Sequence, residues 1–251
     1  GVNKGLLWGI IGGVVGLILI IVAIVVSLIM FSGPSENDYM EAQKVLDEAH
    51  PAYSDISDKI YALFSSSGKG TSNSSAVDSL KKSKQTLDEK FDKLSKMKAI
   101  NGDKKVKEKW DKLNAKRDKF NKMIDFSIEL SEKVLPTYFK VLQIDSYSTV
   151  SDINRMITDI ENISISDTDT KQMMTEAANY LRAARDYANA KSSSSYSYDS
   201  NAYDKYMDAA DRFEAAHKKW TNSVDKRTDE AQIKDEVNDL IEALSHKGKD
   251  S

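Results

Sequence analysis

Residues 5–31 read GLLWGIIGGVVGLILIIVAIVVSLIMF, a stretch without charge in which Ser27 is the only residue that is neither apolar nor glycine. A helix needs about 20 residues to cross the hydrocarbon core of a bilayer, which is about 30 Å thick. The stretch exceeds that length, and no small-residue cleavage site of a signal peptide follows it. We therefore expect residues 5–31 to form a retained transmembrane helix.

The charges on either side of this stretch predict its orientation. Lys4 is the only charged residue before it, whereas the first charges after it are Glu36, Asp38 and Glu41. Basic residues stay preferentially on the cytoplasmic side of a membrane. We expect a single-pass protein of the cell membrane, with residues 1–4 in the cytoplasm and the chain from residue 36 onward outside.

Glycines recur at a spacing of four within the predicted span. Small residues at this spacing share one helix face and allow a second helix to approach closely. Glycine is also frequent in membrane helices that pair with nothing, so both interpretations stay open. If the face is used, it predicts a homo- or hetero-oligomer formed through the membrane helix. The residues of this face are Gly5, Gly9, Gly12, Gly13 and Gly16.

The chain that follows has the pattern of long helices. Ser35 and Asp38 have the spacing of a capping box, which predicts a helix start. Apolar residues then recur at alternating steps of three and four, which predicts a heptad seam with a kink near Pro51. The seam comprises Tyr39, Ala42, Leu46, Ala49, Tyr53, Ile56, Ile60 and Leu63.

Similar patterns predict the remaining helices. They are a helix over 75–100 ending in a left-handed cap at Asn101–Gly102, a helix from about 106 that stops at Pro136, shorter helices opened by Ser148 and Ser166, and a last helix over 202–245 with a change of phase near Ala231. The predicted fold class is all-α: one transmembrane helix followed by an elongated antiparallel helical bundle built from long heptad-like helices.

The predicted domain organisation follows the chain in order. It consists of a cytoplasmic N-terminus (1–4), the transmembrane helix (5–31), a link (32–35), a first module of three long helices (36–135), a second module of shorter helices and a long C-terminal helix (136–247), and a frayed tail (248–251). The chain has no cysteine, so helix packing alone must stabilise it without disulfides.

Positive charge is concentrated in residues 81–122, which hold sixteen basic and seven acidic residues in a chain of net charge −3. The aromatic residues of this segment lie at core spacing rather than among the lysines, so we expect no nucleic-acid binding. A solvated helix face is the simpler interpretation. The functional one is contact with anionic lipid or wall polymer at the predicted hairpin tip, through Lys96, Lys98, Lys104, Lys105, Lys107 and Lys109.

That location follows from helix lengths. A first helix of about 30 residues rises roughly 45 Å from the membrane, and a second of about 26 residues returns roughly 39 Å. If the two helices pack side by side in opposite directions, the turn between them lies near the lipid surface.

Catalytic and metal-binding patterns are missing from the sequence. The chain has three histidines, and Glu214 with His217 forms a Glu-x-x-His pair that dinuclear metal bundles would need twice. No glycine-rich phosphate loop or G-x-S-x-G nucleophile motif occurs. We expect a non-enzymatic protein without cofactor or metal.

Two functional hypotheses remain. The first is a membrane-anchored surface scaffold or binding module outside the cell, acting through protein–protein or polymer contacts. The alternative is a subunit of a pilin-like filament or membrane complex assembled through the glycine face. The layout resembles that of pilins, whose apolar N-terminal helix continues into an outer domain. Pilins carry a glutamate at their fifth mature position, where this chain has Gly5, and they have strands that this sequence does not predict.

Overall fold

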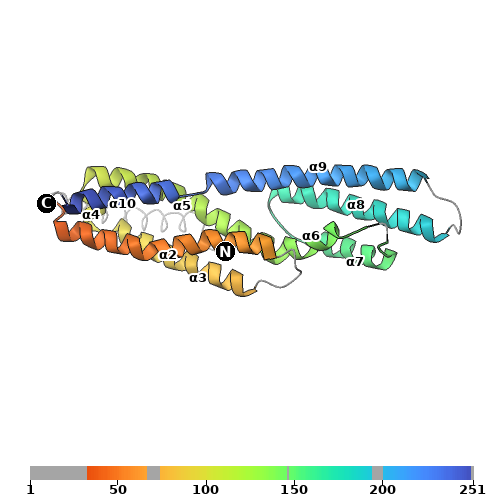
Figure 1. Ribbon diagram of the computed structural model, residues 1–251, viewed down its shortest axis with the longest axis horizontal. Helices are drawn as coiled ribbons and strands as arrows, with labels where there is room; N and C mark the ends of the chain where they lie inside the picture. Colours follow the sequence, from red (N-terminus) through yellow and green to blue (C-terminus); the bar gives the residue numbers. More distant parts are fainter. Residues whose placement is uncertain (1–32, 67–73, 146, 194–199, 250–251) are drawn as a thin grey trace, which may run out of the picture. The chain divides into compact units, whose positions relative to one another are not determined.

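The computed structural model describes residues 33–66, 74–145, 147–193 and 200–249. These residues fold into helices, and no strand occurs among them (Figure 1). The all-helical bundle predicted from the sequence is therefore confirmed for the described part of the chain. Its helices are α2 (Glu36–Ser66), α3 (Ser74–Ser95), α4 (Lys98–Asn101), α5 (Lys104–Glu129), the π-helix η2 (Leu130–Val134), α6 (Leu135–Leu142), α7 (Val150–Glu161), α8 (Thr168–Ser193), α9 (Ser200–Glu230) and α10 (Lys234–Lys249).

None of these described helices is both long and apolar enough to cross a bilayer. The predicted transmembrane helix over 5–31 lies outside the described residues, and so do the five glycines of its proposed packing face. Membrane insertion and helix pairing therefore stay predictions.

The chain divides into two compact units, and each unit combines separate parts of the sequence. The described part of unit 1 contains residues 33–54, 83–118 and 233–249, and that of unit 2 contains the rest. Helices α2, α3 and α5 each contribute residues to both units. The contiguous modules predicted over 36–135 and 136–247 group the residues differently, and that division of the sequence stays a prediction.

Unit 1 begins with the capping box that the sequence predicts. The Ser35 backbone N–H donates to Asp38 Oδ2 at 2.8 Å, and the Asp38 N–H donates back to Ser35 Oγ at 3.2 Å. The seam of α2 from Tyr39 to Ile56 is buried. Pro51 lies inside α2, and the helix continues through that residue.

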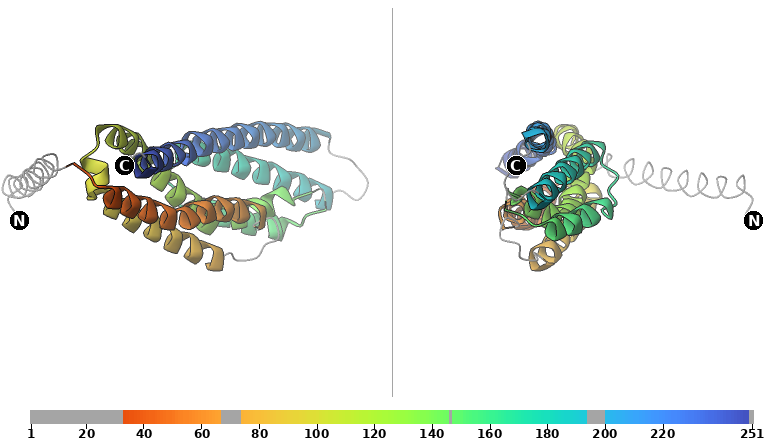
Figure 2. Two further views of the ribbon diagram at one scale, coloured as in Figure 1. Left: turned by 60° about the vertical axis from the view of Figure 1, so that its left-hand side comes forward. Right: turned by 90° about the vertical axis from the view of Figure 1, so that its right-hand side faces the viewer.

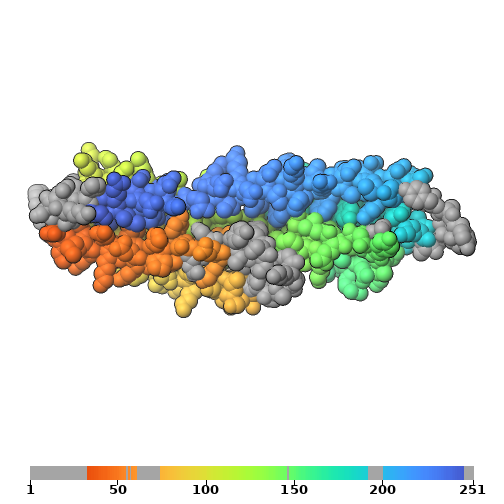
Figure 3. All heavy atoms as spheres, in the orientation of Figure 1, coloured from red at the N-terminus to blue at the C-terminus, as the bar shows by residue number. Residues whose placement is uncertain are grey.

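The other elements of unit 1 surround this seam. Phe91 of α3 and Trp110 of α5 meet edge to face, with ring centroids 6.0 Å apart, in the core. Gln43 of α2 donates to Ser245 Oγ of α10 at 3.1 Å, so the end of α10 lies beside the first part of α2 (Figure 3). Leu240 and Leu244 of α10 are fully buried. The unit is thus a bundle of helices wrapped around one apolar core.

Two predicted helix ends are wrong. In one case a side chain makes the backbone hydrogen bonds of the turn, and in the other a π-helix continues the helix. Gly102 is not in the left-handed region, since its φ is −96°. The Asn101 amide instead donates to the carbonyls of Ser95 and Met97, closing the turn without a left-handed residue. The third helix does not stop at Pro136 either. It passes through η2 into α6, where Pro136 occupies the first turn and its missing N–H is not needed.

Helices α7, α8 and α9 lie side by side in unit 2 (Figure 1). Two predicted caps are displaced by one residue. Thr149 rather than Ser148 caps α7, accepting from the Asp152 N–H at 3.2 Å. Asp167 rather than Ser166 caps α8, accepting from the Thr170 N–H at 3.0 Å. The predicted last helix is divided at residues 231–233 into α9 and α10, where the sequence shows its change of phase.

Candidate functional site: the basic turn

The basic turn is the segment from Ser95 to Lys109, which joins the end of α3, the four-residue α4 and the start of α5. Asp103 caps α5, because its Oδ1 accepts from the backbone N–H of Lys105 at 2.9 Å and of Val106 at 3.2 Å. Ala99, Ile100 and Val106 are fully buried beneath the turn. A capped helix start over a buried apolar base fixes the backbone that carries the lysines.

The first residues of helix α2 contact the basic turn. The Tyr39 hydroxyl donates to Asp103 Oδ2 at 2.7 Å, and Lys98 Nζ lies 3.9 Å from Asp38 Oδ2. Further along, Lys90 Nζ of α3 lies 2.6 Å from Glu48 Oε2 of α2. Helices α2 and α3 therefore run alongside each other in unit 1, and the turn lies beside the start of α2 (Figure 2).

The lysines that follow the Asp103 cap have an unfavourable position relative to the dipole of α5. The first turn of α5 contains no acidic residue, and Lys104, Lys105 and Lys107 lie at this positive end of the helix dipole. Cations at a helix N-terminus are unfavourable. The Asp103 carboxylate at the N-cap offsets part of this positive charge, and Lys104 and Lys105 present the remainder to solvent.

The six lysines predicted to contact an anionic surface fall into two groups. Lys98 pairs with Asp38, and Lys107 Nζ lies 2.9 Å from Asp111 Oδ1. The other four make no ion pair with any described residue: Lys96, Lys104, Lys105 and Lys109. Lys96, Lys104 and Lys105 are exposed, and Lys109 is half-buried.

The groups that fix the turn have shifted pKa values. The Ser35 N–H lowers the pKa of Asp38, with a further contribution from the charge of Lys98. Burial raises the pKa of Tyr39 well above its ordinary value, and its hydrogen bond to Asp103 adds to this effect. Asp38 is thus ionised and Tyr39 neutral at physiological pH, as their contacts with Lys98 and Asp103 require.

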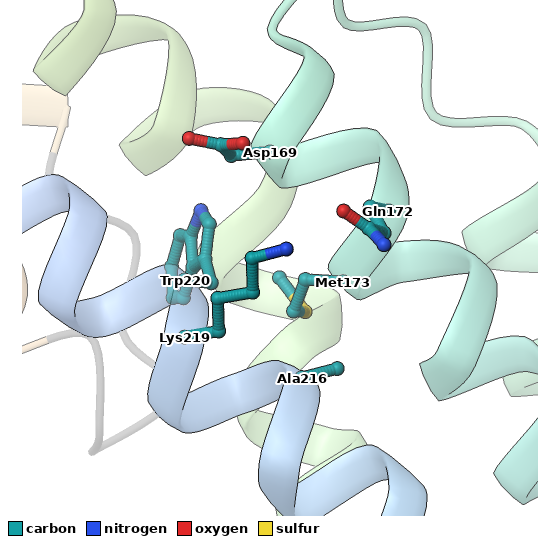
Figure 4. A pocket seen from close by; sticks show the side chains of 6 residues that line it. All are labelled: Asp169, Gln172, Met173, Ala216, Lys219 and Trp220. Atoms are coloured by element: carbon teal, nitrogen blue, oxygen red, sulfur yellow. The ribbon is translucent and has the colours of Figure 1, made fainter.

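A small cavity lies between α8 and α9 in unit 2. It encloses about 30 Å³ and is lined by Asp169, Gln172, Met173, Ala216, Lys219 and Trp220 (Figure 4). Small-molecule sites usually span at least about 300 Å³. This space is sufficient for about one water molecule, so the cavity is not a ligand site.

The residues around that cavity form a structural polar network. Trp220 Nε1 donates to Thr170 Oγ1 at 2.9 Å, and Thr170 Oγ1 donates to Asp167 Oδ2 at 2.7 Å. Arg227 Nη1 donates to Asp167 Oδ1 at 2.7 Å. Burial would raise the pKa of Asp167, but the hydrogen bonds from Arg227 and Thr170 outweigh it and lower the pKa.

His217, whose Glu-x-x-His spacing imitates that of a metal ligand, lies against an aromatic side chain in the structure. Its ring stacks on Tyr138 with centroids 5.6 Å apart, and its buried Nδ1 has no hydrogen-bond partner in the described part of the chain. Burial lowers the pKa of His217. Within the described residues, no group of three or more metal-ligating side chains is gathered in one place.

The sequence singled out the lysines but not the residues that position them. Asp111 follows Lys107 by four residues on a helix, so that ion pair was readable from spacing alone. Tyr39 and Asp103 are 64 residues apart, and no local pattern predicts their contact.

Comparison of the chain with protein-family models, with curated proteins and with solved structures found no match.

Proposed function

We propose that this protein is a non-enzymatic, single-pass surface scaffold or binding module, anchored by residues 5–31, whose basic turn contacts anionic lipid or wall polymer. The observation that carries the proposal is the hydrogen bond between Tyr39 and Asp103. It joins the turn to the first helical residues after the predicted span. A positive surface close to the predicted span is attracted by anionic headgroups or wall polymer.

Two further observations support a binding role for the turn. Four lysines make no ion pair with any described residue, and several lysines occupy a helix N-terminus where they reduce helix stability. A surface selected only for folding favours acidic residues in the first helical turn, where α5 has lysines after its Asp103 cap. The unfavourable placement is explained if the positive charge is used in binding.

The test uses the full chain in lipid vesicles and a fluorophore on the turn. Because the chain has no cysteine, Ser95→Cys supplies a single labelling site. Lipids carrying a quencher on the headgroup then report how close the turn comes to the bilayer. We expect stronger quenching in vesicles containing phosphatidylglycerol than in pure phosphatidylcholine, with a decrease as salt screens the charges.

Replacing all six lysines of the turn by glutamine should remove the response to anionic lipid without changing helicity. A control variant replaces six exposed lysines of unit 2 and should respond like the unchanged protein: Lys140, Lys171, Lys205, Lys218, Lys219 and Lys226. Equal responses of the two variants, or no response of the unchanged protein to either lipid or added polymer, would contradict the proposed function.

A further inference from the structure

The two groups of lysines in the basic turn have different electrostatic surroundings. Asp38 and Asp111 neutralise Lys98 and Lys107, whereas Lys96, Lys104, Lys105 and Lys109 have no acidic partner among the described residues. The prediction made from charge alone treats all six lysines alike. The difference bears on how the surface recognises an anion.

The distance of the turn from the predicted span favours a lipid headgroup over a polymer. Helix α2 begins at Glu36, five residues after Phe31, the last residue of that span. Five extended residues cover at most about 18 Å. Tyr39 then holds Asp103, and with it the start of α5, within one helical turn of that point. The headgroup region adds roughly 5–8 Å to each side of the hydrocarbon core, and the Debye length of about 8 Å at physiological salt extends the reach of its charge toward the turn.

We propose that the basic turn binds the headgroups of anionic phospholipids through Lys96, Lys104, Lys105 and Lys109, and that Asp38 and Asp111 limit this binding by neutralising Lys98 and Lys107. The inference rests on the proposed function. It adds the chemical class of the partner and the two aspartates that limit binding. An anionic headgroup competes with each aspartate for the same lysine. Removing an aspartate therefore strengthens binding, although the turn gains no new basic residue.

Asp111 gives the clearest test of that competition. Asp38 also caps α2, so changing it alters the fold locally. Asp111 is exposed and has one described ion-pair partner, Lys107. Asp239 of α10 is exposed and has no described ion pair, so Asp239→Asn changes the net charge equally and serves as the control.

The experiment uses the labelled full chain described above, with phosphatidylglycerol varied in phosphatidylcholine vesicles. We expect Asp111→Asn to reach half-maximal quenching at a lower fraction of anionic lipid, corresponding to a gain of up to about fivefold in apparent affinity. Asp239→Asn should change the fraction of anionic lipid at half-maximal quenching by less. An equal effect of the two variants would show that Asp111 does not limit binding.

Two double variants with the same charge change test the division of the lysines. Lys104→Gln with Lys105→Gln should lose most of the response, and Lys98→Gln with Lys107→Gln should retain most of it. Equal losses would overturn the division while leaving the proposed function in place. Helicity and melting temperature, measured in parallel, identify any variant that does not fold.

Soluble poly(glycerol phosphate) distinguishes the two sources of phosphate. We expect it to compete weakly with anionic vesicles. If the turn responds to the polymer and not to anionic lipid, the lipid assignment is wrong and the polymer branch of the proposed function remains. If it responds to neither, both proposals fail.

Discussion

At the scale of single residues, His217 links the stability of unit 2 to pH. Burial lowers its pKa, so the folded protein holds a neutral imidazole against Tyr138. The unfolded chain binds a proton near pH 6.5. The stabilising contribution of His217 is therefore fully present above about pH 6.5, and it is lost as the pH falls through the lower pKa of the folded state.

This linkage predicts a specific effect of His217→Phe, which keeps a ring beside Tyr138 but removes the titrating group. The melting temperature of the variant should fall less between pH 7.5 and 5.5 than that of the unchanged protein in the same detergent. His50, which is exposed on α2, provides the control, and His50→Gln should retain the full decrease. If His217→Phe is as sensitive to acid as the unchanged protein, another group causes the pH dependence.

At the scale of helices, the start of α8 shows how a distant residue selects a cap. Ser166 and Asp167 both have side chains that cap helices. Asp167 takes that role in the structure and also accepts from both Nη atoms of Arg227, at 2.7 and 3.3 Å. One carboxylate thus caps the N-terminus of α8 and links this helix to α9.

Asp167→Ala should destabilise the protein by about 2 kcal/mol or more, because it removes a cap and leaves the half-buried Arg227 guanidinium without its partner. Ser166→Ala should change stability by less than about 0.5 kcal/mol, as is usual for exposed positions. Chemical denaturation of the two variants measures this difference directly. A larger loss for Ser166→Ala would mean that Ser166 is the cap.

The same elements show which features the sequence predicts and which it does not. The seam and capping box of α2 are local patterns, and the structure confirms both. The cap of α8 was misplaced because Arg227 lies 60 residues away. Pro136 was predicted to end a helix because a local rule does not anticipate that a π-helix precedes it. In the basic turn the lysines were predictable from charge. The hydrogen bond between Tyr39 and Asp103, which positions the turn, depends on the tertiary fold.

At the scale of the whole molecule, a predicted membrane span precedes the described helical bundle. Unit 1 holds the start of α2, the basic turn and the end of α10 together through the Tyr39–Asp103 and Gln43–Ser245 hydrogen bonds. The N-terminal end of α2 follows the predicted span after a link of four residues, 32–35. We therefore propose that one end of unit 1 lies at the lipid surface.

Spin labels at three single cysteines in the full chain measure that depth in vesicles containing anionic lipid. Ser27→Cys lies in the predicted span, Ser95→Cys on the basic turn, and Ala115→Cys about 16 Å along α5 from Lys104. Relaxation by oxygen and by a water-soluble nickel complex should place residue 27 in the hydrocarbon, residue 95 at the headgroups and residue 115 in water. A water-exposed residue 27, or a residue 95 as far from the bilayer as residue 115, would contradict the account.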